Sequence, residues 1–391
     1  MMSEKELKIK AFEKAAEHLK EALELNDYMA ENPELGSHEF NSSKAMVELL
    51  RKHGIETEYP FAGMATAYKG VINPQYKRRV AVLAEYDALK GIGHACGHCA
   101  SGSASVLTAL AFNDMKDDID FGVDIIGTPD EEIEGCKGIM ADNGVFDGYD
   151  FAIMVHMGPV NCAKVDFIAL DGIGIKFHGA PAHAAAAPTK GRNALNAARL
   201  FFDATDMMRQ HILQEARMHG IIKQGGEASN VVPDLTEIEF ITRAPRRADL
   251  NGITEWVKDC ARAAAMATKT ELELFPVGIP FHDLYVSGLR QKVMDETFDE
   301  LGMEYDDTAG MTGSSDIGNV DYVCPAFHPM AGIGVEQGCH THEFAEAMTG
   351  ETTHRAIEDS AKFMLTLIIR LYSNEELLER IKAEHREYRG L

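Results

Sequence analysis

The chain has 391 residues, of which 45% are hydrophobic and 26% are charged. The length predicts more than one domain. The composition is typical of a globular protein and excludes a mostly disordered or collagen-like chain. The 38 basic and 62 acidic residues give a formal net charge of −24, which disfavours binding to nucleic acid or to an anionic membrane surface. The sequence also lacks an apolar run of the ~18 residues that a membrane span requires.

The seven cysteines are an odd number in a chain of this length, which argues against a disulfide framework. The highly charged N-terminal segment has a helical pattern and does not resemble a secretion signal. We therefore expect a cytoplasmic protein. In that reducing compartment, clustered cysteines more often bind metal or take part in catalysis than form cross-links.

The first fifty residues are predicted to be helical. Apolar residues within 32–61 have the spacing of one helical face. The N-cap of this helix is expected among residues 41–43, and its end at Gly54.

Three short apolar runs follow, at residues 79–89, 121–132 and 150–159, each ending in a polar loop. Because a helical pattern follows the first run, this alternation predicts a mainly parallel sheet with helices on both faces. Ligands of such sheets bind beyond the carboxyl ends of the strands. The side chains at these positions are Asp87, Glu131, Glu132 and His156.

From about Ile168 the pattern changes to a β-α-β-β-α-β order, which predicts a compact α+β domain of ferredoxin-like type. Its elements are expected at residues 171–183 (strand and turn), 191–218 (helix), 231–245 (strand), 250–270 (helix) and 271–275 (strand). We therefore expect an α/β domain of residues 1–168 and 285–391, interrupted by a smaller domain of residues 169–284.

The densest group of metal-ligating residues is Gly-His-Ala-Cys-Gly-His-Cys at 93–99. Cys96 and His98 are two residues apart, so in an extended loop both side chains can reach one Zn²⁺-like ion. Taken alone, the segment is equally compatible with a buried cysteine beside surface histidines. A redox pair or half of a zinc knuckle formed by Cys96 and Cys99 is disfavoured, because no second Cys-x-x-Cys is present.

Two adjacent carboxylates, Glu131 and Glu132, follow the second apolar run and can divide the labour of hydrolysis. One can bind metal while the other takes a proton from water. Adjacent acidic residues are common in a chain with 62 Asp and Glu residues. His156 alone, or the pair His340 and His342 alone, would not indicate a functional site either. Together these groups favour a binuclear metal site. Motifs for a serine hydrolase or for nucleotide binding are absent from the sequence.

Short motifs are spread along nearly the whole chain: EYDAL at 85–89, GIGHACGH at 91–98, GTPDEE at 127–132, GAPAH at 179–183, ASNVVPD at 228–234 and HTHEFAEA at 340–347. In this order they resemble the M20 family of metallopeptidases and amidohydrolases. The resemblance is greatest to the branch that contains aminobenzoyl-glutamate hydrolases, N-acyl-amino-acid hydrolases and some dipeptidases. It implies a zinc-peptidase-like catalytic domain with an inserted lid that also dimerises.

The resemblance also implies roles for individual residues. The ligands of two metal ions would be Cys96, His98, Glu132, His156 and His340. Glu131 would be the general base, and Asp87 would support the metal-binding loop. His183 would stabilise the oxyanion, often in the partner's site. Asn230 and Arg243 would bind the substrate carboxylate. His340 is preferred to His342 because Phe344 follows it at the spacing of the family.

Two positions depart from the family pattern. Glu85 replaces the histidine of the His-x-Asp motif of the more familiar members, so His98 is expected to supply that ligand. Cys99 stands where this branch generally has Asp or Asn. This departure places a thiol next to the proposed ligand His98 and changes the local charge.

The implied activity is hydrolysis of the amide bond of a small N-acyl amino acid or related amide with a free carboxylate. The alternatives are a dipeptidase, a hydrolase that releases an aromatic amine, or a metal-binding homologue that has lost catalysis. The cysteine ligand favours Zn²⁺ over Mn²⁺ or Co²⁺. We expect a homodimer formed through the lid, with larger assemblies left open, and no nucleic-acid or membrane partner.

Overall fold

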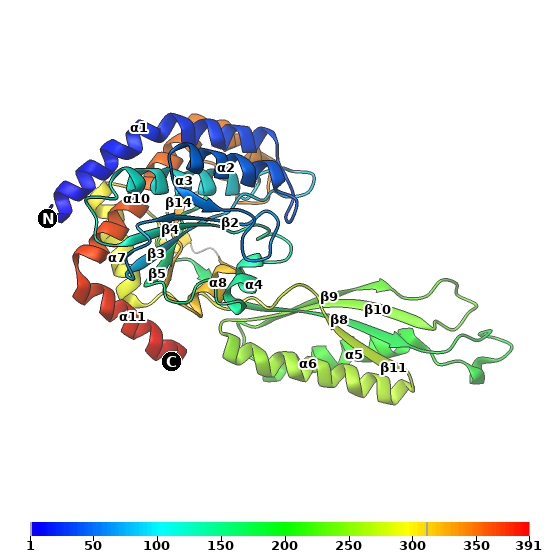
Figure 1. Ribbon diagram of the computed structural model, residues 1–391. Helices are drawn as coiled ribbons and strands as arrows, with labels where there is room; N and C mark the ends of the chain where they lie inside the picture. The colour runs from blue at the N-terminus through cyan, green and yellow to red at the C-terminus, as the bar shows by residue number, and fades with distance from the viewer. Residues whose placement is uncertain (1, 310–311, 391) are drawn as a thin grey trace. The chain divides into compact units, whose positions relative to one another are not determined.

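The structure is a computed structural model that describes residues 2–309 and 312–390. The chain divides into two compact units (Figure 1). The large unit comprises Met1–Phe167 and Leu284–Leu391, and the inserted unit comprises Ile168–Asp283.

A six-stranded mixed sheet forms the centre of the large unit. Its order is β1 (Glu56–Glu58), β2 (Tyr68–Ile72), β4 (Gly122–Gly127), β3 (Arg79–Ala84), β5 (Phe151–Ile153) and β13 (Ala326–Phe327). Strands β4, β3, β5 and β13 are parallel, whereas β1 and β2 are antiparallel to their neighbours. The mainly parallel α/β domain predicted from the sequence is therefore confirmed.

Strand β3 shows why this sheet is covered on both faces. Val80, Val82 and Ala84 belong to one buried cluster, and Ala81 and Leu83 belong to another. A strand that is apolar on both faces is typical of a buried parallel sheet.

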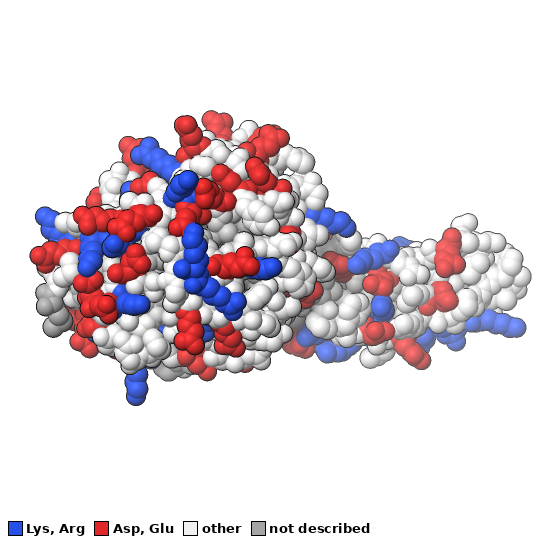
Figure 2. Space-filling model, turned by 45° about the horizontal axis from the view of Figure 1, so that its top comes forward, with Lys and Arg blue, Asp and Glu red and all other residues white. Residues whose placement is uncertain are grey.

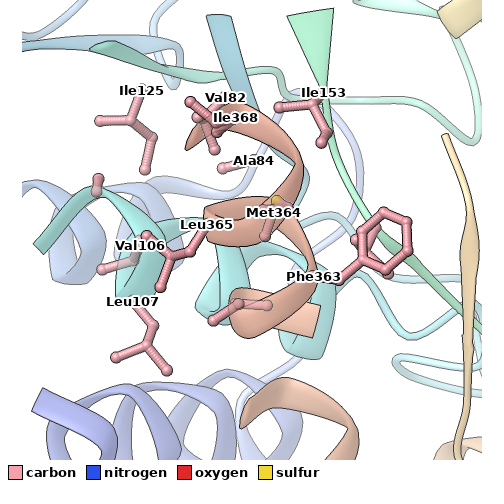
Figure 3. Packing of buried hydrophobic residues seen from close by; sticks show 14 of the residues in the cluster. Val82, Ala84, Val106, Leu107, Ile125, Ile153, Phe363, Met364, Leu365 and Ile368 are labelled. Carbon is pink, nitrogen blue, oxygen red and sulfur yellow. The ribbon is translucent and has the colours of Figure 1, made fainter. Parts of the chain in front are cut away.

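Helices from both ends of the chain cover these two faces. One face packs against α1 (Glu4–Glu31), α3 (His98–Asp114) and α10 (Glu351–Ser373), and the other against α4 (Cys136–Asp142) and α8 (Ile317–Asp321). Figure 3 shows side chains of α10, among them Met364 and Ile368, packed toward Val82 and Ile153 of the sheet. The long helix α10 is thus part of the core.

Side chains cap the starts of the first two helices, and neither of these caps was predicted from the sequence. Ser3 and Glu6 form a capping box at the start of α1. Helix α2 (Phe40–Lys52) begins one residue before the predicted caps at 41–43, so that prediction is wrong. The carboxylate of Glu34 accepts the backbone N–H groups of residues 41 and 42 instead, and it does so because it lies over the exposed end of the helix.

The remaining elements of the large unit are short or lie at its edge. They are β6 (His156–Gly158), β7 (Asp166–Phe167), α7 (Gly288–Leu301), β12 (Thr312–Gly313), β14 (Met330–Gly332), α9 (His342–Glu346) and α11 (Glu375–Arg389). Strand β6 pairs in parallel with β14, and β7 pairs with β12.

The inserted unit is a four-stranded antiparallel sheet with two helices. The sheet order is β11 (Glu271–Pro276), β8 (Ala169–His178), β10 (Leu235–Ala244) and β9 (Arg217–Gln224), and the helices are α5 (Ala194–Met208) and α6 (Arg247–Thr268). The predicted β-α-β-β-α-β order and α+β class are therefore confirmed. The helix predicted for 191–218 was too long, since α5 ends at Met208 and Arg217 begins β9. Pairing with β10 along the whole of β9 overrides the local helical pattern there.

Among the described residues, no helix combines the length and the apolar character needed to cross a bilayer. On the face of the large unit shown in Figure 2, acidic and basic side chains are interspersed. Such mixing leaves no extended field of a single sign on this face.

Candidate metal centre

Loops at the carboxyl ends of the parallel strands carry most of the metal-ligating side chains that were predicted from the sequence. Cys96 lies in the loop after β3, and His98 is the first residue of α3. Glu132 follows β4, and His156 begins β6 just after β5. This is the edge of the sheet at which parallel α/β folds bind their ligands.

The fifth residue, His340, comes from the C-terminal part of the chain. Its backbone N–H donates to the carbonyl of Ala95 at 2.8 Å, which brings it beside Cys96. Its φ of 69° lies in the left-handed region, where residues other than glycine are uncommon. Such strained residues are concentrated at functional sites. His342, the alternative ligand, is the first residue of α9 and is exposed.

The ligand atoms form two groups that share one residue. Cys96, His98 and His156 form the first group, and Cys96, Glu132 and His340 form the second, with the atoms of each group within 4.8 Å of one another. Cys96 Sγ lies 3.5 Å from His156 Nε2, and Glu132 Oε1 lies 3.3 Å from His340 Nε2. Cys96 therefore belongs to both sets of ligands.

Asp87 fixes the orientation of this arrangement. Its Oδ1 lies 2.7 Å from His98 Nδ1, and its Oδ2 accepts the backbone N–H of Glu132 at 3.0 Å. Because Nδ1 donates to Asp87, Nε2 is the ring nitrogen that can bind a cation once it is deprotonated. In the described part of the chain this buried Nε2 has no hydrogen-bond partner. A thiolate, imidazoles and a carboxylate form a donor set that suits Zn²⁺-like ions, so the residues present fit a pair of divalent cations.

The two carboxylates of the Glu131–Glu132 pair have different electrostatic surroundings. Burial by itself would raise the pKa of Glu132, but the hydrogen bond from His340 and the charge of His98 outweigh it and lower that pKa to about 2. Burial and the negative charges of Asp316 and Glu85 raise the pKa of Glu131 well above its usual range. Glu131 also forms a third ligand-type group with His98 and Glu132. Divergent pKa values in adjacent carboxylates are typical of a pair with one ligand and one base.

A buried charged triad lies next to these residues, and no local pattern in the sequence indicated it. Lys137 Nζ lies 2.5 Å from Glu85 Oε1 and 2.6 Å from Asp316 Oδ1, and all three side chains are fully buried. Glu85 Oε2 lies 3.4 Å from His98 Nε2. Lys137 appears in the sequence as an ordinary polar residue of a short helix, so its burial could be recognised only from the fold.

Two further side chains contact the predicted ligands. The ring of His328 stacks on that of His156 with a centroid distance of 5.5 Å, and burial lowers the pKa of His328 to about 3, which keeps it neutral. The thiol of Cys339 is hydrogen-bonded with Cys96, and this contact lowers the pKa of Cys339 while it raises that of Cys96. The sequence signal for both was weak: a histidine after a strand and a cysteine before His340.

Cys99 lies in the main apolar cluster of the large unit and is fully buried. Burial raises its pKa far above the usual range of a thiol, so it is neutral. Neither ligand group of the described residues includes it. The structure therefore places Cys99 among apolar core residues.

The other three predicted site residues belong to the inserted unit. His183 is exposed, and its Nδ1 accepts backbone N–H groups of residues 185 and 186 at 3.3 and 3.1 Å. Because Nδ1 accepts, the proton of the neutral ring is on Nε2, which is then a donor. A backbone bridge from His183 to Val231 places Asn230 beside it.

Arg243 lies at the opposite end of β10. From Leu235 to Arg243 the strand advances eight residues, or about 27 Å at 3.4 Å per residue, and Asn230 lies beyond Leu235. Arg243 is partly buried on the central strand, and burial lowers its pKa. Asn230 and Arg243 of one chain are thus too far apart to hold the same carboxylate.

This fold and this arrangement of ligands define a metal-dependent hydrolase, and comparison with known proteins identifies its family. The model of peptidase family M20/M25/M40 matches residues 81–370. The chain is 31% identical over 395 residues to the Xaa-Arg dipeptidase of Mus musculus, covering 95% of this chain and 91% of that protein. The protein belongs to peptidase family M20/M25/M40, and it is a metal-dependent hydrolase of amide bonds.

Other similarities agree with this family. The chain is 31% identical over 274 residues to one of the subunits of the p-aminobenzoyl-glutamate hydrolase of Escherichia coli, covering 64% of this chain and 56% of that protein. A putative aminohydrolase from Staphylococcus aureus has the same fold, with a TM-score of 0.78 at 21% identity over 92% of this chain and 98% of that chain. A dinuclear metal-binding M20 peptidase from Bacillus subtilis has a TM-score of 0.66 at 20% identity, covering 90% and 99% of the two chains. The resemblance recognised in the sequence is confirmed.

Proposed function

We propose that the two ligand groups, which share Cys96, would hold two divalent ions, and that Glu131 is the general base of amide hydrolysis. The observation that carries this proposal is the membership of Cys96 in both groups. Two bound ions would polarise the amide carbonyl and make water more acidic. The sulfur ligand favours Zn²⁺, and Mn²⁺ or Co²⁺ are the alternatives.

Glu131 takes the proton from the attacking water and delivers it to the leaving amine. Its raised pKa suits this role, because a carboxyl group that is too acidic returns the proton poorly. Asp87 keeps His98 and the loop of Glu132 in place while the charges change. His328 stays neutral behind His156 and adds no positive charge to the site.

The proposed substrate is a small N-acyl amino acid or related amide with a free carboxylate. A guanidinium such as that of Arg243 forms paired, charge-assisted hydrogen bonds with a carboxylate. His183 Nε2–H is free of the backbone contacts that hold Nδ1 and donates to the oxyanion. The names of the relatives, Xaa-Arg dipeptidase and p-aminobenzoyl-glutamate hydrolase, both place an amino acid on one side of the cleaved bond.

A dipeptide is the second candidate substrate. The similarity to the Xaa-Arg dipeptidase extends over 95% of the chain, whereas that to the p-aminobenzoyl-glutamate hydrolase covers 64%. This difference favours the dipeptidase alternative over release of an aromatic amine.

We also propose that the inserted unit is a lid and that it forms a homodimer. Strand β9 is an edge of the sheet, and Ile221 and Ile222 on it are exposed. A second copy that pairs with this edge would satisfy its open backbone groups and cover part of these side chains. In such a dimer His183 and Asn230 act in the partner's site, and Arg243 acts in its own. This assignment accounts for the distance between Asn230 and Arg243.

The compartment proposed is the reducing cytoplasm. All seven cysteines lie within the described residues and are free thiols. Cys96 must remain a thiolate to serve as a ligand, and a reducing compartment keeps it available.

Substitution of Glu131 tests the central assignment. Glu131→Gln should abolish release of free amine from N-acyl amino acids and dipeptides while the metal content stays unchanged. Glu134→Gln changes an exposed carboxylate of the same loop and should behave as wild type. Retained hydrolysis in the Glu131→Gln enzyme would remove the proposed base, and equal rates on substrates with an amidated carboxyl end would remove the proposed substrate class.

A further inference from the structure

We propose that His18, Glu21 and His53, with Asp114, form a second site for a Zn²⁺-class cation, separate from the metal centre. His18 and Glu21 lie on α1, His53 follows the last residue of α2, and Asp114 is the last residue of α3. Such an ion would link the N-terminal helix to the two helices beside it.

This cluster is far from the metal centre along α3. His98 is the first of the 17 residues of α3 and Asp114 the last. At 1.5 Å per residue the two ends are about 24 Å apart. An ion held at Asp114 therefore cannot be either ion of the catalytic pair.

The ligand atoms of the cluster already face one another. Those of His18, Glu21 and His53 all lie within 4.8 Å of one another. The two imidazole rings meet edge to face with a centroid distance of 4.5 Å. His18 Nε2 lies 3.0 Å from Asp114 Oδ2, and His53 Nε2 lies 3.1 Å from Glu21 Oε1. Ligand atoms around tetrahedral Zn²⁺ are about 3.3 Å apart, so the two contacts already have the spacing of ligands. Asp114 contacts His18 but lies outside the group of three, so it is the fourth ligand that must move toward the ion.

The sequence and the fold both support the cluster. His18 and Glu21 are three residues apart on a helix, so they share one face. The carbonyl of His53 accepts a hydrogen bond from Asn113 at 3.0 Å, which joins the end of α2 to α3. The backbone is thus fixed, and only side chains need to move.

The charges and the exposure of the cluster suit a cation. Lys52 pairs with Glu21 Oε2 at 2.5 Å, which leaves Oε1 for the ion. The side chain of His18 is 9% exposed, and those of Glu21 and His53 are 27% and 20% exposed. A cation can therefore enter from solvent while the ligands stay largely dehydrated. Two imidazoles favour Zn²⁺, Co²⁺ or Ni²⁺ over Mg²⁺ and Ca²⁺, which prefer oxygen.

Uptake of Zn²⁺ by the holoenzyme tests the site. With the catalytic centre loaded, equilibrium dialysis against Zn²⁺ should show one more bound ion per wild-type chain than per His53→Gln chain. Asp114→Asn should weaken this binding at least tenfold. His354→Ala is the control, because it removes a histidine that pairs with Asp27 of the same α1 helix at 2.7 Å. Among the described residues, no third ligand joins His354 and Asp27. The His354→Ala protein should therefore bind Zn²⁺ like the wild type.

Cobalt distinguishes the two kinds of site without depending on a variant. The added Co²⁺ ion should give tetrahedral absorption bands without thiolate-to-cobalt charge transfer, because this site has no sulfur ligand, unlike the centre with Cys96. Absence of extra uptake by the wild type, or equal uptake by wild type and His53→Gln, would overturn the proposal. So would a charge-transfer band on the added ion. Hydrolytic activity of the His53→Gln holoenzyme should be unchanged, so failure here is separable from failure of the catalytic assignment.

Discussion

Lys137 Nζ lies 2.5 Å from a carboxylate oxygen of Glu85, and both side chains are fully buried beside the proposed metal ligand His98. Asp316 pairs with the same ammonium group at 2.6 Å. A single positive charge thus offsets only one of two carboxylates in the interior, and the net negative charge that remains when both are ionised favours cations next to it. The triad belongs to the support of the metal centre as well as to the core.

Removal of the Lys137 charge should destabilise the fold strongly. In Lys137→Met the two buried carboxylates lose the ammonium group that lies between them, and removal of one partner of a buried ion pair typically costs about 3–5 kcal/mol. The free energy of unfolding, followed by circular dichroism in urea, should fall by that order. Addition of Glu85→Gln to the same chain should restore part of the loss, because one uncompensated charge is removed. Lys164→Met, at an exposed lysine of the large unit, is the control. A Lys137→Met protein as stable as wild type would contradict this interpretation.

The pH profile of hydrolysis should respond to the charge of Asp316. Burial and then the negative charge of Asp316 raise the pKa of Glu131. Asp316→Asn removes that charge, so the pKa of Glu131 should fall and the base should stay ionised to lower pH. The acid limb of kcat/KM against pH should therefore move to lower pH. Asp142→Asn, at an exposed position at the end of α4, should leave the limb in place. An acid limb that stays in place or moves to higher pH would show that Asp316 does not act on the base.

The metal content of three variants should differ in a fixed order. Cys96 belongs to both ligand groups, whereas His156 and His340 each belong to one. Cys96→Ala should therefore lower the bound metal more than His156→Ala or His340→Ala. Elemental analysis of the purified proteins measures this directly. Equal losses in all three variants would argue against a role of Cys96 in both ligand groups.

Cys99→Ala is the matched control for these variants. The side chain lies in the apolar core and carries no charge, so metal content should be retained while stability falls by about 1 kcal/mol. Loss of metal in this variant would instead support the role beside the ligands that the sequence suggested for Cys99.

The parts of this site that could be predicted are those that local sequence determines. Cys96 and His98 are two residues apart, and Glu131 and Glu132 are adjacent, so each pair was visible as a motif before the fold was known. The placement of these motifs at strand ends followed from the alternation of apolar runs and helices. Lys137 and Asp316 meet from segments far apart in the chain, and no local pattern encodes such a contact. The residues of strand β9, which the predicted order implied but did not locate, were not identified for a similar reason, because its pairing with β10 is a tertiary interaction.

The edge of β9 should decide the oligomeric state. Ile221 is 61% exposed there, and lysine on an edge strand opposes pairing with a second strand. Ile221→Lys should therefore convert a dimer into a monomer in size-exclusion chromatography with light scattering. The kcat should fall as well, because His183 and Asn230 would no longer reach the partner's site. Met266→Lys, at a position on α6 that is 73% exposed, is the control and should remain dimeric.

Mixing His183→Ala with Glu131→Gln chains adds a second measurement. One site of such a heterodimer has an intact base and receives an intact histidine from the partner, so the mixture should regain activity that neither variant has alone. A dimeric Ile221→Lys protein, or a mixture without regained activity, would refute shared sites across β9.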